Sequence, residues 1–325
     1  MRAITIPTFG AADVLTLAEL PDPEPAPGEV LIAVAAAGVN RSDIGQRQGS
    51  YPPPAGAPDW PGLEVSGTIV GLGPGVTRWS IGDRVCALLP GGGYASLAVA
   101  SAGQVLPVPQ NVDLVDAAGL PEVLATVWSN LFMLAGLQAG ETLLVHGGSS
   151  GIGTAAIQLA RAKGCRVAVT AGSKDKLEAC RRLGADILID YRRDDFVEAV
   201  LAATDGAGAD VILDPIGGGY LRRNLNAIAR RGRLAIIANQ SGQVGELDIR
   251  ALMGKWASIF GSTLRARPAA EKDEIIASLL ENAWPLVAAG QVVPVIDSRI
   301  PLEQAAAAHQ RMESSKHIGK LLLIP

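Results

Sequence analysis

Residues 142–163 read TLLVHGGSSGIGTAAIQLARAK, and this stretch decides the fold. The apolar run TLLVH predicts a buried strand, and the amphipathic run that ends in ARAK predicts a helix. Glycines in the turn between them, from Gly147 to Gly153, let backbone N–H groups and a helix N-terminus approach a pyrophosphate. The flanking strand and helix are the context that this motif requires. We therefore expect a nucleotide site here. The alternative is a tight turn whose glycines serve close packing alone.

The same strand-then-helix alternation continues after the turn. The runs RVAVTAG, DILID, DVILDPIG and GRLAIIAN are continuously apolar, as in parallel strands covered by helices on both faces. The helical runs between them end at Gly164, Gly184 and Gly232, which we expect at C-caps, so that YLRRNLNAIARR is read as helix. The repetition predicts a doubly wound α/β sheet.

The chain before this region has a different texture. Runs such as VLIAVAA and VSGTIVGL are rich in strand-forming residues and are separated by proline and glycine. We expect residues 1–120 to form a mainly β domain, residues 121–290 to form the nucleotide domain, and residues 291–325 to return to the first domain.

Composition narrows the classes of function. A length of 325 residues predicts about two domains, and 48% hydrophobic with 18% charged residues excludes wholesale disorder. A net charge of −4 gives no reason to expect a nucleic-acid partner. The apolar stretches fall short of the ~20 residues that cross a bilayer. We expect a soluble cytoplasmic protein without a membrane partner.

Metal ligands and disulfides are not expected. The three cysteines form no CxxC pair, and no two of the three histidines stand at a metal-binding spacing. We interpret the cysteines as small buried hydrophobic residues. The cysteines are Cys86, Cys165 and Cys180, and the histidines are His146, His309 and His317.

The end of the second strand of the nucleotide domain indicates which dinucleotide is bound. An acidic residue here accepts a hydrogen bond from the ribose 2′-hydroxyl of NAD, whereas the 2′-phosphate of NADP needs cations and small donors. The segment holds Gly172, Ser173, Lys174 and Lys176, which favours NADPH, although Asp175 argues against it. The alternative is that these lysines are only the solvated start of a helix.

Several stretches, in order along the chain, resemble one enzyme family. They are AGVNRSD from Ala37, RQGSYPPPAGAP from Arg47, GLEVSG from Gly62, LLPGGGYA, GGSSGIGTAAIQLA, VTAGSKDKL, LDPIGGGY and HIGKLLL. They are similar to the medium-chain dehydrogenase/reductase superfamily and, within it, to the zinc-independent quinone oxidoreductases of the zeta-crystallin type, most of all to the damage-inducible subgroup. The resemblance implies a doubly wound parallel Rossmann sheet inserted into a mainly β GroES-like catalytic domain.

Zinc-dependent members of that superfamily differ from this chain at two ligand positions. Asn40 stands where they have a cysteine, and Leu63 where they have a histidine, while Glu64 remains. We therefore expect no catalytic zinc. Without a Lewis acid the substrate must already accept hydride readily, as quinones and α,β-unsaturated carbonyl compounds do. The resemblance implies NADPH-dependent quinone reduction in the interdomain cleft.

The resemblance also implies site residues. Tyr51 would donate a hydrogen bond or proton to the substrate oxygen, and Asn40 would contact the nicotinamide ribose or the substrate. Their alternatives are an exposed loop tyrosine and a helix N-cap. The implied cofactor contacts are Thr126, Gly148, Ser149, Ser150, Gly151, Ile152, Gly153, Gly172, Ser173, Lys176, Tyr191, Ile216, Gly217, Ser241, Ser262, Thr263 and Lys320.

Two rival functions stay open. One is an enoyl or alkenal reductase with the same fold and cofactor, and the other is a non-catalytic NADPH-responsive binding or structural protein. RNA binding is disfavoured because the arginine pairs, such as Arg230-Arg231, are expected on the solvated faces of helices. The apolar segment ASIFGSTL from Ala257 predicts an edge strand through which a homodimer forms.

Overall fold

The computed structural model describes residues 1–325, which form two compact units. The first unit comprises Met1–Ala125 and Leu264–Pro325, and the second comprises Thr126–Thr263. These boundaries differ from the expected ones, because residues 264–290 belong to the first unit. The reason is packing: Asp273 accepts a hydrogen bond from Gln104 at 3.1 Å, and Trp284 Nε1 donates to the carbonyl of Pro107 at 2.8 Å.

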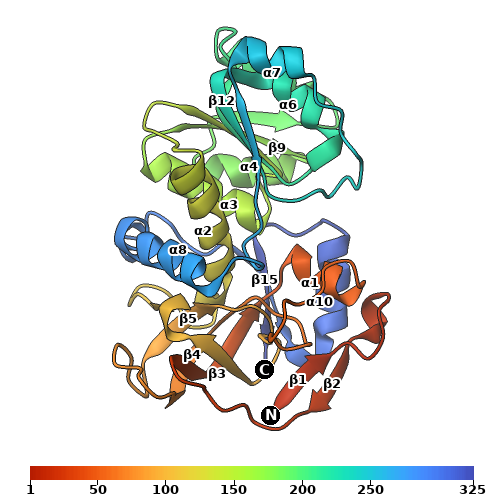
Figure 1. The fold of residues 1–325 in the computed structure, drawn as a ribbon. Helices are drawn as coiled ribbons and strands as arrows, with labels where there is room; N and C mark the ends of the chain where they lie inside the picture. Colours follow the sequence, from red (N-terminus) through yellow and green to blue (C-terminus); the bar gives the residue numbers. More distant parts are fainter. The chain divides into compact units, whose positions relative to one another are not determined.

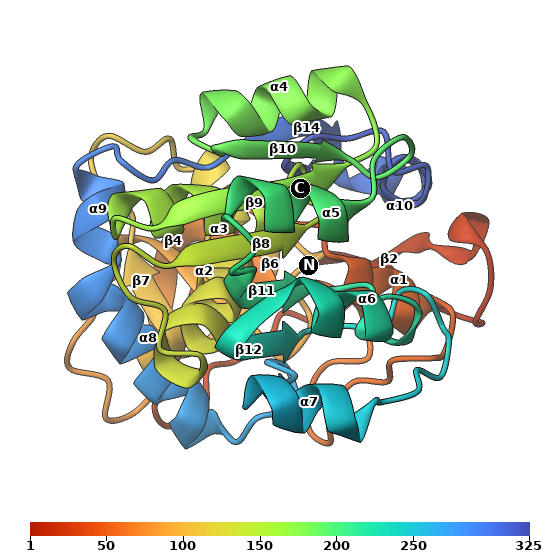
Figure 2. The ribbon, with the colours of Figure 1, turned by 90° about the horizontal axis from the view of Figure 1, so that it is seen from above.

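A six-stranded parallel sheet forms the centre of the second unit. The strand order is β10-β9-β8-β11-β12-β13, and Figure 2 shows the first five of these strands in this order. The strands are β8 (Thr142–His146), β9 (Arg166–Ala171), β10 (Ile187–Asp190), β11 (Ala209–Asp214), β12 (Ile228–Ile236) and β13 (Ser258–Gly261). This order, with its reversal between β8 and β11, is that of a dinucleotide-binding doubly wound fold, so the expected fold is confirmed.

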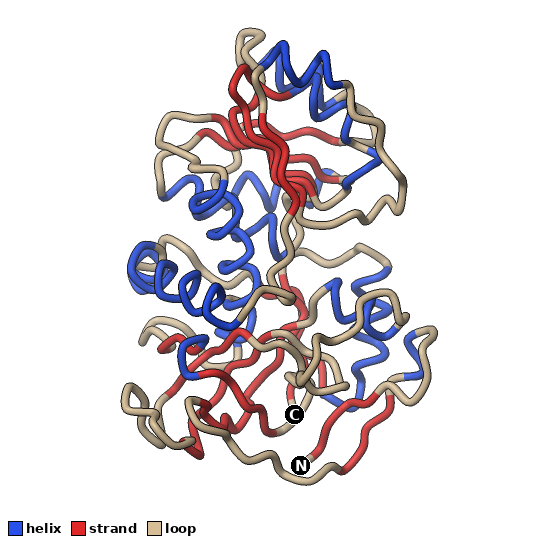
Figure 3. Tube along the Cα trace, in the orientation of Figure 1, coloured by secondary structure: helices blue, strands red, loops and turns tan.

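Helices lie on both sides of this sheet, as Figure 3 shows. The central strands are therefore largely apolar, and every residue of β8 is buried. The helical segments are α3 (Gly151–Ala162), α4 (Lys174–Arg182), α5 (Phe196–Ala203), η5 (Gly217–Gly219), α6 (Leu221–Ala227) and α7 (Ile249–Lys255). As predicted, α3 and α4 end at glycines with positive φ, +80° at Gly164 and +105° at Gly184.

One helix prediction in this unit is wrong. The run read as helix to Gly232 leaves the helix at Ala227, and Gly232 lies within β12 instead of at a C-cap. Ile228 already pairs with Ala209 of β11, and the register shifts before Arg233 pairs with Val211. Arg231 takes a left-handed φ of +63° in this irregularity. The arginine pair Arg230-Arg231 is therefore on a bulged strand and not on a helix.

The first unit is built on a mixed sheet. Its order is β14-β15-β3-β4-β5-β7, β6 also pairs with β3, and Figure 1 shows β3, β4 and β5 together. The strands are β3 (Glu29–Gly38), β4 (Glu64–Leu72), β5 (Arg84–Leu88), β6 (Leu97–Ser101), β7 (Val105–Pro107), β14 (Ile296–Pro301) and β15 (Lys320–Ile324). A separate antiparallel pair joins β1 (Arg2–Thr5) to β2 (Thr16–Glu19). The expected mainly β first domain, with the tail returning to it, is confirmed.

Short helices complete the first unit. They are η1 (Ala12–Val14), α1 (Arg41–Arg47), η2 (Ala102–Gln104), η3 (Asp116–Gly119), α8 (Ala269–Asn282), α9 (Trp284–Ala288), η6 (Leu302–Gln304) and α10 (Ala305–Glu313). Its core gathers side chains far apart in the sequence, among them Ile32, Val65 and Leu323. Burial of these apolar faces contributes most of the stabilisation of the sheet.

The chain passes from the first unit to the second within α2 (Pro121–Val127), which continues as the π-helical η4 (Trp128–Leu134). The helical stretch Asp116–Leu134 is 19 residues long and apolar enough to cross a membrane, which the sequence analysis did not anticipate. However, 78% of the apolar 18-residue window within it is buried inside the structure, as in a core helix. This stretch is therefore weak evidence for a membrane segment.

Candidate functional site

The glycine-rich turn of the second unit connects β8 to α3. Gly147 has a φ of +72°, and Ser150 caps the helix by accepting a hydrogen bond from the Gly153 N–H at 3.0 Å. A Cβ at Gly153 would collide with the backbone of Gly147 and Gly148, and one at Gly148 would come within 2.7 Å of Val169. Close packing alone explains these glycines. The first turn of α3 carries no acidic side chain that would repel an anion. The N-terminus of this helix is therefore suited to the pyrophosphate of a dinucleotide.

A buried polar chain connects this turn to the turn after β11. Gly147 N–H donates to Thr170 Oγ1 at 3.2 Å, and Thr170 Oγ1 lies 3.2 Å from His146 Nδ1. His146 Nε2 lies 2.8 Å from Asn224 Oδ1, and Asn224 donates to Asp214 at 2.8 Å. The network fixes the tautomer: His146 accepts from Thr170 and donates to Asn224.

Asp214 holds the second of these turns. Its Oδ1 accepts the N–H groups of Ile216 at 2.6 Å and Gly217 at 3.2 Å. Burial raises the pKa of Asp214 to about 6, although its hydrogen bonds oppose the shift, and burial lowers the pKa of His146 to about 4. At neutral pH this hydrogen-bond network therefore contains the carboxylate of Asp214 and the neutral imidazole of His146. Sequence reasoning missed this hydrogen-bond network, because its only sign in the sequence is that polar residues stand at the ends of apolar strands.

The predicted 2′-phosphate contacts gather at the carboxyl end of β9. A Cβ on Gly172 would collide with the hydroxyl of Tyr191, so these two residues are in contact. Ser173 caps α4 by accepting the N–H of Lys176 at 3.4 Å. Tyr191 is 46% exposed. The arrangement brings the Tyr191 hydroxyl next to the start of α4, whose first turn carries Lys176, and such donors suit a phosphate monoester.

The remaining predicted cofactor residues of the second unit lie mainly in turns and helix ends. Ser262 Oγ donates to Asn130 Oδ1 at 2.7 Å, and Asn130 Nδ2 donates to the carbonyl of Thr126 at 2.9 Å. Ser241 Oγ accepts the N–H of Gly219 at 3.1 Å. Ser149 is buried in the glycine turn, and Thr263 is the last residue of the unit. Their cofactor contacts stay predictions.

In the first unit, a buried lysine organises the region around Asn40. The ammonium of Lys320, 4% exposed, contacts Glu64 Oε1 at 2.6 Å, Asn40 Oδ1 at 2.7 Å and the carbonyl of Val39 at 2.9 Å. Asn40 Nδ2 also donates to Glu64 at 2.9 Å, and the N–H of Glu122 donates to the other oxygen of Glu64 at 2.9 Å. All three N–H donors of the ammonium therefore have partners within this unit.

The contacts of this cluster show which position Asn40 takes and whether the residues around Lys320 suit a metal ion. Asn40 takes the N-cap position of α1, where its N–H donates to Asp43 at 2.8 Å, so the N-cap alternative describes its backbone. Leu63 is buried and has no ligand atom. No group of three His, Cys, Asp or Glu side chains in residues 1–325 could hold a metal. The donor set around Lys320 does not fit a zinc ion, because an ammonium already satisfies the remaining carboxylate.

Tyr51 lies on the loop after α1, next to a buried arginine. The guanidinium of Arg265 is 5.5 Å from the centroid of the Tyr51 ring, and its Nε donates to the carbonyl of Pro90 at 2.7 Å. Burial and then the carboxyl group of Glu122 raise the pKa of Tyr51, while Arg265 opposes the rise. Tyr51 is therefore protonated at neutral pH and can donate a hydrogen bond. Sequence reasoning missed Arg265 and Glu122, since neither stands near Tyr51 in the chain.

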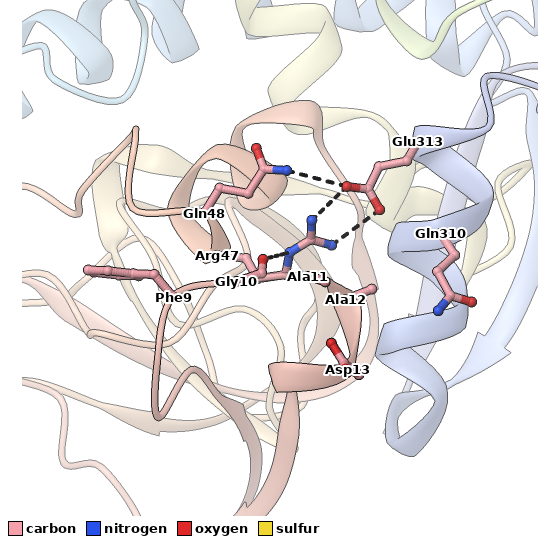
Figure 4. A pocket seen from close by; sticks show the side chains of 9 residues that line it. All are labelled: Phe9, Gly10, Ala11, Ala12, Asp13, Arg47, Gln48, Gln310 and Glu313. Atoms are coloured by element: carbon pink, nitrogen blue, oxygen red, sulfur yellow. Dashed lines mark hydrogen bonds and ion pairs between the residues drawn. The ribbon is translucent and has the colours of Figure 1, made fainter.

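The clearest surface cavity lies elsewhere in the first unit. Its volume is about 730 Å³, and none of the predicted catalytic or cofactor residues lines it. Arg47, at its floor, is held by Glu313 at 2.6 Å and by the carbonyl of Gly10 at 3.1 Å, as Figure 4 shows. The lining residues are Phe9, Gly10, Ala11, Ala12, Asp13, Arg47, Gln48, Gln310 and Glu313. Because its cation is already paired, this cavity offers no group for the chemistry at Tyr51.

Comparisons with known proteins agree with this architecture. Residues 26–110 match the alcohol dehydrogenase GroES-like domain, and residues 151–281 match the zinc-binding dehydrogenase family. A quinone oxidoreductase of Rattus norvegicus is 34% identical over 330 residues, which cover 100% of this chain and 98% of the rat protein.

Two solved structures are similar over nearly their whole length. The quinone oxidoreductase of Escherichia coli complexed with NADPH has a TM-score of 0.88 and 28% identity and covers 100% of both chains. The CurK enoyl reductase has a TM-score of 0.87 and 27% identity and covers 99% of this chain and 98% of its own. The chain therefore belongs to the medium-chain dehydrogenase/reductase superfamily, in the family of the quinone oxidoreductases, and is an oxidoreductase.

Proposed function

We propose that this protein reduces quinones with NADPH and without a metal ion. The observation that carries the proposal is the cluster of Lys320, Asn40 and Glu64. In this cluster the ammonium of Lys320 pairs with the carboxylate of Glu64, the one residue of the zinc-ligand positions that the chain retains. A substrate reduced there receives no help from a Lewis acid, so it must be electron-poor. Quinones meet this requirement because their reduction forms an aromatic ring. The E. coli and rat relatives bear the same activity in their names.

NADPH would supply a hydride when bound to the second unit. The N-terminus of α3 would hold its pyrophosphate, while Ser173, Lys176 and Tyr191 would surround its 2′-phosphate. Lys176→Ala is expected to raise the Kd for NADPH at least tenfold while leaving the Kd for NADH nearly unchanged. Arg182→Ala, in the exposed last turn of the same helix, is the matched control. Equal Kd values for NADPH in Lys176→Ala and in the wild type would remove Lys176 from the site.

Tyr51 would donate a hydrogen bond to the oxygen of the substrate, and then a proton. A phenol whose pKa is raised holds its proton at neutral pH, so the donor is present when negative charge develops on that oxygen. Anaerobic NADPH oxidation with 1,2- and 1,4-quinones tests this role. Tyr51→Phe should lower kcat by about 10²-fold, the range for loss of one general acid, at an unchanged Kd for NADPH. Full turnover in Tyr51→Phe would refute it.

The second candidate function is reduction of α,β-unsaturated carbonyl compounds. It is favoured by the similarity to the CurK enoyl reductase, and it uses the same donors for an enolate oxygen. The two candidates differ in the ratio of kcat/KM for matched quinones and enones. A clear preference for enones would replace the quinone assignment. Tight NADPH binding with no turnover on either class would instead favour the non-catalytic binding protein.

A homodimer would form through β13. This strand pairs only with β12, and its exposed residues leave one edge of the parallel sheet without a partner strand. A second copy of the chain would pair with this edge across a two-fold axis. Sedimentation of the wild type against Ile259→Pro tests the proposal, because proline removes a ladder donor. A monomeric wild type would contradict it.

A further inference from the structure

Arg265 is a buried cation without a carboxylate partner. It is 5% exposed, yet no Asp or Glu oxygen forms an ion pair with it. Its Nε donates to the carbonyl of Pro90 at 2.7 Å and its Nη1 to the carbonyl of Tyr51 at 3.5 Å. Its Nη2 is buried and has no hydrogen-bond partner. A buried donor left unsatisfied costs about 1–3 kcal/mol, so such a group calls for an explanation.

The surroundings increase the local positive charge. Lys272 Nζ lies 3.5 Å from the carbonyl of Arg265, and its burial places a second ammonium in the same region. The charges that favour the ionised guanidinium of Arg265 are that of Asp43 first and then those of Tyr51 and Glu122, and Glu122 also influences Lys272 and Tyr51. Burial, and then the charge of Glu64, raises the pKa of Glu122 to about 8. At neutral pH Glu122 is therefore largely uncharged, so Asp43 is the main carboxylate that acts on the guanidinium, and it forms no ion pair with it.

Tyr51 and Arg265 are therefore two donors at one place. The guanidinium lies 5.5 Å from the centroid of the Tyr51 ring, and the phenol still carries its proton. Gly91 packs beside this group, and because a Cβ there would come 3.2 Å from Nη2 of Arg265, glycine leaves more room next to the unpartnered nitrogen than any other residue would. A fixed cationic donor that has no hydrogen-bond partner of its own is the kind of group that stabilises an oxyanion as it forms.

We propose that Arg265 contacts the substrate, donating from Nη2 to the carbonyl oxygen that becomes an oxyanion during reduction. This inference rests on the proposed function and adds a residue to it. The acceptor gains two electrons and a proton as hydride, and its oxygen carries the resulting negative charge until a second proton arrives from Tyr51. The nicotinamide donor is oxidised in the same step. Arg265 gives up none of its protons and binds the charge throughout.

The test separates contact with substrate from a structural role at Pro90. Arg265→Met removes the charge and the donor, and Arg84→Gln, at the exposed start of β5, is the matched control. Three quantities are measured at neutral pH: kcat/KM for a quinone, the Kd for NADPH, and the Kd of 4-nitrophenolate, a stable phenolate that represents the oxyanion. We expect Arg265→Met to lose about 10²-fold in kcat/KM, typical of one oxyanion donor. It should bind 4-nitrophenolate at least tenfold more weakly and NADPH as the wild type does.

The phenolate measurement keeps the two proposals distinguishable. If the wild type reduces neither quinones nor enones but binds 4-nitrophenolate through Arg265, the proposed function fails and the oxyanion contact stands. If Arg265→Met binds 4-nitrophenolate as tightly as the wild type does, the contact is refuted whatever the turnover. Should Arg265→Met not fold, Arg265→Lys decides: it keeps the charge but loses the forked donors, so we expect several-fold weaker phenolate binding. Unchanged binding in that variant refutes the inference.

Discussion

Replacing Lys320 by methionine tests the interpretation of the first unit most directly. The variant keeps an unbranched apolar side chain, one atom shorter, and removes the charge. Glu64, which is fully buried, loses a partner at 2.6 Å, and the oxygens of Asn40 and Val39 lose donors at 2.7 and 2.9 Å. A carboxylate is then left in the interior without its countercharge.

The expected cost follows from that burial. Removing one partner of a buried ion pair destabilises a protein by about 3–5 kcal/mol, since the other charge stays desolvated. In a domain of this size each kcal/mol lowers Tm by roughly 2–4 °C, so the expected decrease is roughly 6–20 °C. Removing both charges in Lys320→Met/Glu64→Gln should recover more than half of the loss, because no unpaired charge remains.

Urea denaturation followed by circular dichroism measures the change, and scanning calorimetry confirms it. The matched control is Arg299→Met, which breaks an exposed pair with Asp116 at 2.6 Å in the same unit. We expect that change to cost less than about 1 kcal/mol. If Lys320→Met costs no more than Arg299→Met, the ammonium does not hold the cluster together and the reasoning about the metal-ligand positions fails with it.

Three further predictions concern other groups. The pKa of Glu122 is about 8 in the folded chain and 4.5 in the unfolded chain. Ionising Glu122 therefore opposes folding, and the stability of the wild type falls as the pH rises between these two values. Glu122→Gln should therefore gain on the wild type by up to ~1.4 kcal/mol per pH unit across that window, and parallel stability curves would contradict the raised pKa. Gly153→Ala should weaken NADPH binding at least tenfold in a fluorescence titration, because the added Cβ meets backbone atoms of the turn. Its control, Gly254→Ala, has open space around the added Cβ and should stabilise α7 by ~0.5–1 kcal/mol. Equal NADPH affinity in Gly153→Ala and the wild type would count against the predicted turn. Tyr94→Phe should cost about 1–3 kcal/mol in urea denaturation, since Asp43 at 2.9 Å and His309 at 3.1 Å both lose a partner, and an unchanged midpoint would show that this buried contact is not needed.

Local patterns in the sequence predicted most of the fold. Continuous apolar runs located the strands of the parallel sheet, and Gly164 and Gly184 marked helix ends because their φ values require glycine. The prediction failed at Gly232, where a helical pattern of apolar residues extends beyond Ala227. Pairing of Ile228 with Ala209 overrides that pattern, and a single sequence carries no sign of it.

The candidate site was predicted less completely. Tyr51 and Asn40 came from resemblance, whereas their contacts join residues far apart in the chain: Arg265 lies 214 residues from Tyr51, and Lys320 lies 280 from Asn40. Spacing arguments detect neighbours on one helix or strand and cannot detect such pairs. The domain boundary near residue 290 failed for the same reason, since α8 is assigned to the first unit by contacts such as that of Asp273 with Gln104.

The insertion of one unit into the other has a consequence for synthesis on the ribosome. Residues 126–263 are contiguous, so the parallel sheet can assemble as soon as they emerge. The first unit cannot, because β15 pairs with β3 and its Lys320 reaches the carbonyl of Val39, made 281 residues earlier. Until then Glu64 has no countercharge and the edge of β3 that β15 will cover is open. The nascent chain is therefore expected to need protection from aggregation mainly in its earliest segment.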